Sequence, residues 1–210
     1  MNEPAAALAP RSPALPRAAT LRDAFNLPNL ITLARLLAVP LAIWLILYGH
    51  YAPAFWVFIG AGISDALDGY IAKRFDSRTP LGALLDPVAD KALLAGVYVT
   101  LGLAELLPHW LVILVVLRDA LIVGGFVAIH TAGSPRAFER LDVSPLYSSK
   151  INTSVQIVLV GYVLARLGVG AEDGPVTLFL IAAAAATTVW SGLSYLVRWA
   201  RLLGRSEPAL

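Results

Sequence analysis

The chain has 210 residues, of which 58% are hydrophobic and 14% are charged, and its mean hydropathy is +0.73. This composition is too apolar for a soluble domain of ordinary makeup, and it predicts an integral membrane protein. The formal net charge of +2 and the pI near 9.0 favour anionic lipid surfaces. The sequence holds no basic stripe typical of nucleic-acid binding, so nucleic acid is not expected as a partner.

The first 20 residues are rich in Ala and Pro, and we expect a disordered tail there. Residues 21–27 are expected to form a short interfacial helix. Runs of about 20 apolar residues then predict six membrane-spanning helices, at about 27–48, 53–73, 83–105, 110–131, 151–169 and 175–199. The predicted fold is an all-α membrane domain over residues 21–202, followed by a C-terminal tail at 203–210.

Lysine and arginine near the ends of membrane helices set their orientation, because these residues are retained on the cytoplasmic side. The basic residues fall before the first predicted helix, between the second and third, between the fourth and fifth, and at the end of the sixth: Arg11, Arg17, Arg22, Lys73, Arg74, Arg78, Arg136, Arg140, Lys150, Arg198, Arg201 and Arg205. The opposite connections hold only Arg166. Both termini are therefore predicted to be cytoplasmic. The Ala- and Arg-rich usage favours a bacterial inner membrane, with a mitochondrial membrane as the alternative.

Four aspartates lie at the cytoplasmic ends of the second and third predicted helices: Asp65, Asp68, Asp86 and Asp90. An ionised carboxylate in hydrocarbon costs at least about 2.5 kcal/mol, so a group of four implies a compensating cation. Residues three or four apart share a helix face, which pairs Asp65 with Asp68 and Asp86 with Asp90. Oxygen ligands without cysteine or nearby histidine favour Mg²⁺, Mn²⁺ or Ca²⁺. The alternative for a single aspartate is a helix cap, which does not account for all four.

Small residues on the same two helices leave room for a flat or phosphorylated ligand to approach the backbone. These residues are Gly69, Ala72 and Gly82. A metal beside such a slot suits a nucleotide diphosphate, which would arrive from the cytoplasmic side.

Residues 65–90 read D-x2-D-G-x2-A-K-x8-G-x3-D-x3-D. This pattern resembles the signature of the CDP-alcohol phosphatidyltransferases. Seven of the eight fixed positions of that signature are met, and the departure is Lys73, where the family has arginine. The charge is kept but the planar guanidinium fork is lost, so a bidentate phosphate contact depends on Arg74.

Flanking segments extend the resemblance over roughly residues 26–160. Residues 26–35 resemble the opening of the phosphatidylglycerophosphate synthases and cardiolipin synthases. Residues 81–119 and 149–156 are more similar to the eukaryotic-type, CMP-forming cardiolipin synthases. The tails on either side carry no such resemblance.

The resemblance implies an enzyme that transfers the phosphatidyl group of CDP-diacylglycerol to an alcohol and releases CMP. It implies two Mg²⁺ or Mn²⁺ ions bound by Asp65, Asp68, Asp86 and Asp90. It also makes Asp90 the general base, and it implies a homodimer. The same resemblance implies that the CDP group is bound by Asp65, Asp68, Gly69, Ala72, Lys73, Arg74 and Gly82.

Two further cations are candidates for binding the phosphate of the acceptor. Arg118 is predicted to reach into the polar cavity, with a structural pair to a neighbouring helix as the alternative. It is not expected to form a self-contained pair with Asp119, because adjacent residues on a helix do not face each other. Lys150 begins the fifth predicted helix, and its alternative role is a snorkelling interfacial lysine.

Asn152 bears on the choice of acceptor. Glycerol 3-phosphate synthases of this superfamily generally have a second lysine at the matching position. One cation fewer suits the singly charged phosphodiester of phosphatidylglycerol, so cardiolipin synthesis is predicted, with phosphatidylglycerophosphate synthesis from glycerol 3-phosphate as the alternative. A membrane transporter would also use intramembrane carboxylates, yet the sequence shows no internal repeat. A non-catalytic membrane scaffold leaves the aspartates unexplained.

Overall fold

The computed structural model describes the backbone over residues 27–75, 80–132 and 146–203, and the side chains over residues 33–64, 91–125 and 146–200. Within these ranges the chain is helical apart from short connections. The helices are α2 (Leu27–Leu47), α3 (Tyr51–Phe75), α4 (Pro80–Leu103), α5 (His109–Ala132), α7 (Tyr147–Gly168) and α8 (Pro175–Leu203). They coincide with the six predicted apolar segments, so the all-α prediction is confirmed for this part of the chain. The predicted N-terminal tail, the predicted interfacial helix up to residue 26, and residues 204–210 lie outside the described residues.

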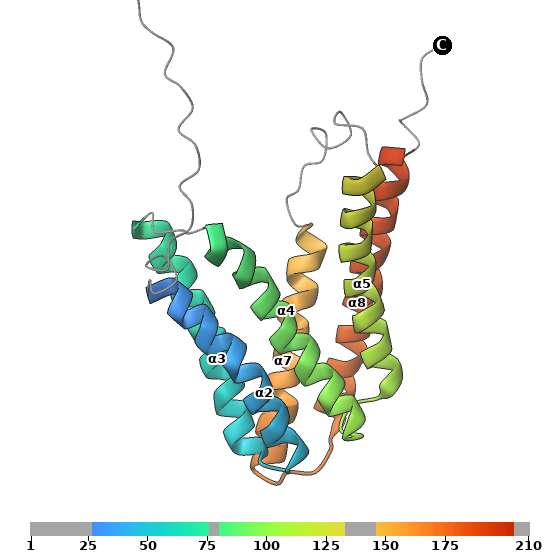
Figure 1. Ribbon diagram of the computed structural model, residues 1–210. Coiled ribbons are helices and arrows are strands. Elements are labelled where there is room, and N and C mark those ends of the chain that lie inside the picture. Colours follow the sequence, from blue (N-terminus) through green and yellow to red (C-terminus); the bar gives the residue numbers. More distant parts are fainter. Residues whose placement is uncertain (1–26, 76–79, 133–145, 204–210) are drawn as a thin grey trace, which may run out of the picture.

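Three short connections lie at one end of the helices, the lower end in Figure 1: residues 48–50, 104–108 and 169–174. In two of them, Gly49 and Gly170 have φ of 76° and 69°. This left-handed conformation is open to glycine because it has no Cβ. The C-terminal end of α3 and the N-terminal ends of α4 and α7 lie at the opposite end of the molecule.

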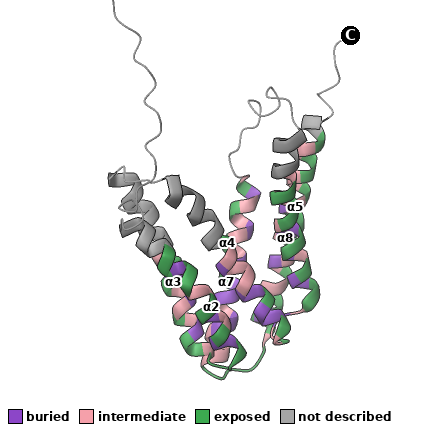
Figure 2. Cartoon of the chain, in the orientation of Figure 1, coloured by how far each residue is buried: buried purple, intermediate pink, exposed green. Residues whose placement is uncertain are grey.

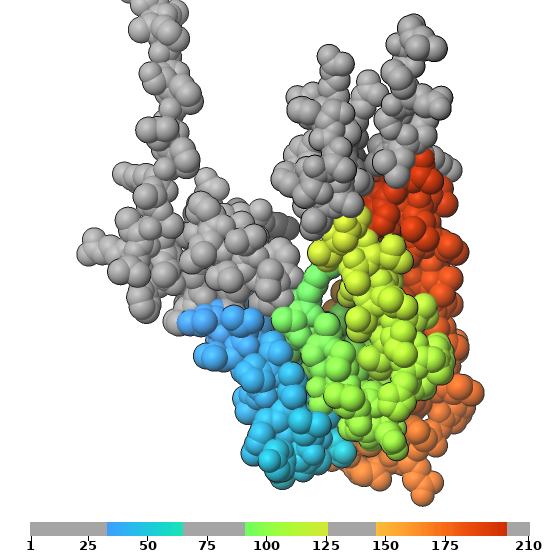
Figure 3. Space-filling model, turned by 45° about the vertical axis from the view of Figure 1, so that its right-hand side comes forward, coloured from blue at the N-terminus to red at the C-terminus, as the bar shows by residue number. Residues whose placement is uncertain are grey.

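Helix α7 lies between two groups of helices (Figure 1). On one side, α2 packs against both α3 and α4, and α3 also packs against α7. On the other side, α8 packs against both α7 and α5. On the face shown in Figure 3, α2, α4, α5 and α8 follow one another across the surface. The two helices that carry the aspartates are therefore both in contact with α2.

Buried residues line the contacts between helices, while exposed residues cover the outer faces (Figure 2). The largest fully buried apolar side chains include Tyr98, Ile46, Leu101, Leu111, Leu159 and Leu164. Large apolar side chains are also exposed on the outside, among them Leu37, Trp56, Leu103, Leu178 and Phe179. An exposed apolar surface of this extent is unfavourable in water and suits contact with lipid.

Two helical segments are long and apolar enough to cross a membrane by length and composition, among the residues that the structure describes. They are Tyr147–Gly168 and Pro175–Ala200. Shorter apolar stretches occupy Leu33–Leu47, Tyr51–Ser64 and Lys91–Leu103. The structure thus supports a membrane association, and it leaves the number of spanning helices as a prediction.

Two glycines allow helices to approach each other closely. A Cβ placed on Gly168, at the end of α7, would lie 2.9 Å from Ala52 Cα at the start of α3. A Cβ on Gly125 of α5 would overlap the ring of Trp199 on α8. Small residues at such crossings are typical of helix pairs in membranes, because backbone packing replaces the hydrophobic driving force there.

Candidate functional site

The four predicted metal ligands lie on two consecutive helices. Asp65 and Asp68 belong to α3, and Asp86 and Asp90 belong to α4, each within about three turns of the connection at residues 76–79. Both pairs keep helical spacing, so each pair shares one face of its helix. Their side chains are outside the described ranges, and the metal site stays a prediction. Where side chains are described, no group of three His, Asp or Glu residues gathers that could hold a metal ion.

The residues predicted to bind the CDP group share these two helices. Gly69, Ala72, Lys73 and Arg74 follow the first aspartate pair on α3, and Gly82 precedes the second pair on α4. The backbone therefore places the whole signature on the C-terminal part of α3 and the N-terminal part of α4, which follow each other along the chain. The CDP contacts themselves involve side chains outside the described ranges, and they stay predictions.

Arg35 is a buried cation to which the sequence analysis gave no role. It lies on α2, the helix that packs against both α3 and α4, and only 2% of its surface is exposed. A signal for it was present in the sequence, because Arg35 is the only Asp, Glu, Lys or Arg between Asp23 and Asp65. A charged residue kept inside an apolar helix marks a functional site by default.

Arg35 lines a cavity of about 420 Å³ whose walls are otherwise chiefly apolar. The walls come from α3, α4 and α7, and they include Phe58, Leu93 and Ile157. This volume lies within the range of small-molecule sites. Leu94, another lining residue, follows Asp90 by four residues, which is about 6 Å along a helix axis. The cavity thus adjoins the part of α4 that carries the predicted site.

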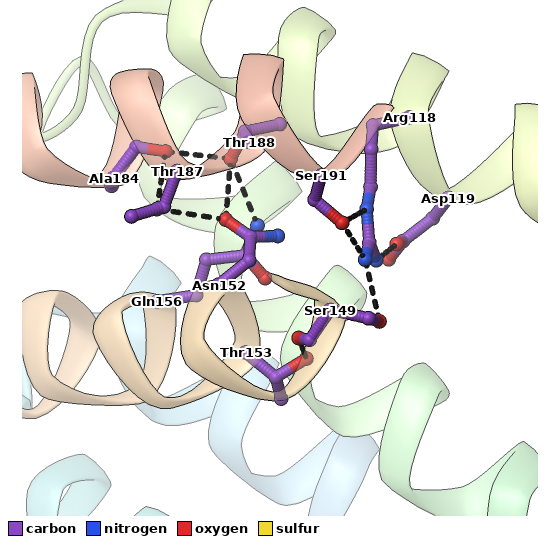
Figure 4. A network of polar contacts seen from close by, with 10 residues as sticks. All are labelled: Arg118, Asp119, Ser149, Asn152, Thr153, Gln156, Ala184, Thr187, Thr188 and Ser191. Carbon is purple, nitrogen blue, oxygen red and sulfur yellow. Dashed lines mark hydrogen bonds and ion pairs between the residues drawn. The ribbon is translucent and has the colours of Figure 1, made fainter. Parts of the chain in front are cut away.

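Arg118 lies on α5 with 5% of its surface exposed. Its guanidinium donates hydrogen bonds to hydroxyls on two other helices (Figure 4). Nε and Nη2 donate to Ser191 Oγ of α8 at 3.2 and 2.6 Å, and Nη2 also donates to Ser149 Oγ of α7 at 2.6 Å. The centroid of the Tyr195 ring lies 6.0 Å from Arg118 Cζ. Three helices therefore meet at this one side chain.

Arg118 and Asp119 do form an ion pair, although adjacent helix residues were expected not to face each other. The pair is not self-contained, because Arg118 also bonds to Ser149 and Ser191. Arg118 Nη1 lies 2.6 Å from Asp119 Oδ1, and the two side chains are 6% and 25% exposed. The long stem of arginine accounts for this contact between adjacent residues. The bonds to Ser149 and Ser191 direct the guanidinium to a point that the Asp119 carboxylate also reaches. Contacts with neighbouring helices, the alternative considered for Arg118, are present, and its contact with the acceptor phosphate stays a prediction.

A second group of polar side chains joins α7 to α8 one turn away (Figure 4). Asn152 Oδ1 lies 3.0 Å from Thr187 Oγ1 and 2.9 Å from Thr188 Oγ1. Gln156 Nε2 donates to Thr188 Oγ1 at 3.3 Å. Asn152 is 0% exposed and Gln156 is 1% exposed. The amide of Asn152, which the sequence analysis related to the acceptor, thus lies at the contact between α7 and α8.

Lys150 lies in the first turn of α7 and is exposed. Its neighbour Ser149 is the α7 residue that accepts from Arg118, and consecutive residues on a helix point about 100° apart. The structure therefore brings Ser149, which the sequence analysis did not single out, to Arg118. The contact of Lys150 with the acceptor stays a prediction.

Comparison with known proteins gives a family match over most of the chain. The family model described as CDP-alcohol phosphatidyltransferase matches residues 25–190. This range contains the aspartate signature, Arg35, Arg118 with Asp119 and Ser149, and the Asn152 contacts. Ser191 lies one residue beyond it.

Three relatives illustrate the similarity. The chain is 35% identical over 185 residues to a cardiolipin synthase (CMP-forming)/mitochondrial hydrolase fusion protein of Schizosaccharomyces pombe, covering 82% of the chain and 31% of that protein. It is 32% identical over 182 residues to the cardiolipin synthase (CMP-forming) of Homo sapiens, covering 81% of the chain and 60% of that protein. It is 30% identical over 181 residues to the CDP-diacylglycerol–glycerol-3-phosphate 3-phosphatidyltransferase of Escherichia coli, covering 82% of the chain and 93% of that protein. The chain thus spans only part of the two eukaryotic relatives and nearly the whole of the bacterial one.

Proposed function

The chain belongs to the CDP-alcohol phosphatidyltransferase family, and from this membership we propose that it transfers the phosphatidyl group of CDP-diacylglycerol to phosphatidylglycerol. The products are cardiolipin and CMP. The observation that carries the proposal is the aspartate signature, which lies on two consecutive helices within about three turns of their connection. Similarity to CMP-forming cardiolipin synthases of several eukaryotes supports the choice of acceptor.

The donor set on α3 and α4 fits the divalent metal that the family resemblance implies. Four carboxylates at helical spacing offer hard oxygen ligands, which Mg²⁺ and Mn²⁺ prefer. We assign Asp65, Asp68, Asp86 and Asp90 to hold the metal. Two bound ions would neutralise the charge of the donor's pyrophosphate.

The chemical step is an in-line displacement at phosphorus. A hydroxyl oxygen of the acceptor forms a bond to the lipid-side phosphorus, and the bond from that phosphorus to the CMP oxygen breaks. The electron pair of the broken bond leaves on CMP, and Asp90 accepts the proton of the attacking hydroxyl. Arg118 and Lys150 bind the phosphodiester of the acceptor and orient its hydroxyl.

We propose that all six helices span the membrane, with both termini and the aspartate signature on the cytoplasmic side of a bacterial inner membrane. The basic residues in the tails and connections on the signature's side of the helices support that orientation. The direction of the helices agrees with it, because the signature-bearing ends of α3 and α4 lie opposite the three short connections. The family resemblance adds the proposal of a homodimer.

Phosphatidylglycerophosphate synthesis from glycerol 3-phosphate is the second candidate function. Two relatives are named for this reaction: the Escherichia coli enzyme, at 30% identity, and a probable phosphatidylglycerophosphate synthase of Mycobacterium tuberculosis, at 31% identity. The chain covers 93% and 84% of these two proteins. The two candidates share the donor, the aspartates and the leaving group, and they differ in the acceptor alone.

One experiment separates the two functions. The purified protein is given CDP-diacylglycerol with either phosphatidylglycerol or glycerol 3-phosphate, and the lipid formed is identified by mass spectrometry. We expect cardiolipin from phosphatidylglycerol and little product from glycerol 3-phosphate. Ready formation of phosphatidylglycerophosphate without cardiolipin would establish the second candidate instead.

A further inference from the structure

Two serines from different helices hold the guanidinium of Arg118. Ser191 of α8 is fully buried and accepts from Nε and Nη2, while Ser149 of α7 accepts from Nη2. The shortest contact with each serine is 2.6 Å, and hydrogen bonds from a charged donor are shorter and stronger than those between neutral groups. The orientation of the guanidinium is thus set by α7 and α8, although the residue itself belongs to α5.

The hydrogen bonds to Ser149, Ser191 and Asp119 do not use every N–H donor of the Arg118 guanidinium. A guanidinium has five N–H donors. Among the described residues, Nε uses one on Ser191, Nη2 uses two on Ser149 and Ser191, and Nη1 uses one on Asp119. One N–H of Nη1 is left over. Each serine hydroxyl accepts from Arg118 and keeps its own hydrogen, which can serve as a further donor.

The contact between Asn152 and Thr188 lies close to both serines and joins their two helices. Ser149 precedes Asn152 by three residues on α7, and Ser191 follows Thr188 by three residues on α8. The bond between Asn152 and Thr188 therefore lies about one turn from both serines. A polar contact between helices in an apolar environment fixes their relative position. The Asn152–Thr188 bond thereby helps to keep both serines beside the Arg118 side chain.

We propose that Ser149 and Ser191 are positioning residues for the acceptor, acting through Arg118. The proposal rests on the proposed function, in which Arg118 binds the acceptor phosphodiester. Without the serine hydroxyls, the buried guanidinium keeps only Asp119 as an anionic partner and turns toward it. The remaining N–H then no longer faces the acceptor. The serines contribute to acceptor binding and leave the binding of CDP-diacylglycerol unchanged.

The test compares each serine with a matched serine on the same helix. Ser191→Ala is compared with Ser194→Ala, and Ser149→Ala with Ser154→Ala, because among the described residues the control hydroxyls donate to the backbone of their own helix, at Trp190 and Lys150. Initial rates are measured while either substrate is varied. We expect the KM for phosphatidylglycerol to rise about tenfold in Ser191→Ala and Ser149→Ala, since a hydrogen bond to a charged group is lost. The KM for CDP-diacylglycerol should stay within about twofold, and both controls should match the wild-type protein.

Two further variants separate positioning from folding. Ser191→Thr keeps the hydroxyl and should restore most of the acceptor affinity. In an Arg118→Ala background, Ser191→Ala should cause no further rise in the KM for phosphatidylglycerol, because the residue through which it acts is gone. An equal rise with and without Arg118, or an unchanged KM in Ser191→Ala, would overturn the proposal. If the wild-type protein uses no acceptor with CDP-diacylglycerol, the proposed function itself is wrong.

Discussion

Charged residues inside apolar helices are costly unless another group compensates them. Arg118 is compensated by Asp119 and by two serine hydroxyls, and Arg35 is equally well buried on α2. Removing one partner of a buried charged contact costs about 3–5 kcal/mol, since the other charge is left uncompensated. Substitutions at these residues are therefore expected to have large effects.

The aspartates should differ in their roles. Asp65→Ala and Asp86→Ala are expected to weaken both donor binding and turnover, because each removes a proposed metal ligand. Asp90→Asn should lower kcat by about 10² or more with a smaller change in donor KM, since an amide cannot accept the proton of the hydroxyl. Near-normal turnover of Asp90→Asn in initial-rate assays would show that another group is the base.

Arg35 should matter for the reaction, because it lies on the helix that contacts both signature-bearing helices. Arg35→Ala is expected to lower kcat/KM for CDP-diacylglycerol by about 10², and Arg35→Lys should lose less because the charge is kept. Leu37→Ala, an exposed change on the same helix, is the control and should be near neutral. The same small loss for Arg35→Ala and Leu37→Ala would contradict a functional role of this cation.

Removal of divalent metal should abolish activity. Four carboxylates within two helices need a cation, so excess EDTA should stop CMP release, and Mg²⁺ or Mn²⁺ added back should restore it. The measurement is the rate of CMP formation by the purified protein, with a second chelator as control. Undiminished turnover in both chelators would contradict the metal site.

Helices α3 and α7 meet closely at the end with the short connections. A Cβ on Gly168 would lie 2.9 Å from Ala52 Cα and 3.0 Å from Ala52 N, which is backbone that cannot move aside easily. A Cβ on Gly124 of α5 would have no atom of another described segment within 4 Å. The two glycines therefore form a matched pair for testing this contact.

Gly168→Ala should destabilise the protein by about 1–3 kcal/mol through overpacking. Gly124→Ala should be neutral or stabilising by up to about 1 kcal/mol, because alanine is the better helix former. Both effects can be measured as shifts in the thermal unfolding midpoint in detergent. Equal midpoints for the two variants would show that the close contact with Ala52 is absent in solution.

At the scale of helices, the sequence predicted the elements well and their contacts poorly. Apolar runs are bounded by Pro, Gly and charged residues, so the positions of all six described helices could be predicted. Apolar periodicity does not specify a partner, and nothing in the sequence indicated that Asn152 bonds to Thr188 on α8. The Arg118–Asp119 pair was missed because rules for helix faces describe Cβ directions, whereas a long side chain is directed by bonds to other helices.

At the scale of the whole molecule, the distribution of basic residues predicts which end faces the cytoplasm. The chain has no cysteine, so a single cysteine can be introduced at Ser77, Ser206 or Ala171. Positions 77 and 206 should be shielded from an impermeant thiol reagent in intact cells, while position 171 should be labelled. Labelling of position 77 from outside would invert the orientation and remove the nucleotide's route to the aspartates.

The contact between Gly168 and Ala52 lies at the C-terminal end of α7 and the N-terminal end of α3, whereas the signature lies in the C-terminal half of α3. Helix α7 has 22 residues and is therefore about 33 Å long. If α7 rotated by about 5° around its contact with Ala52, its N-terminal end would move by about 3 Å, because the displacement grows with the length of the helix. A single methyl group at Gly168 is thus expected to change the spacing around Ser149 and Arg118, at the far end of α7.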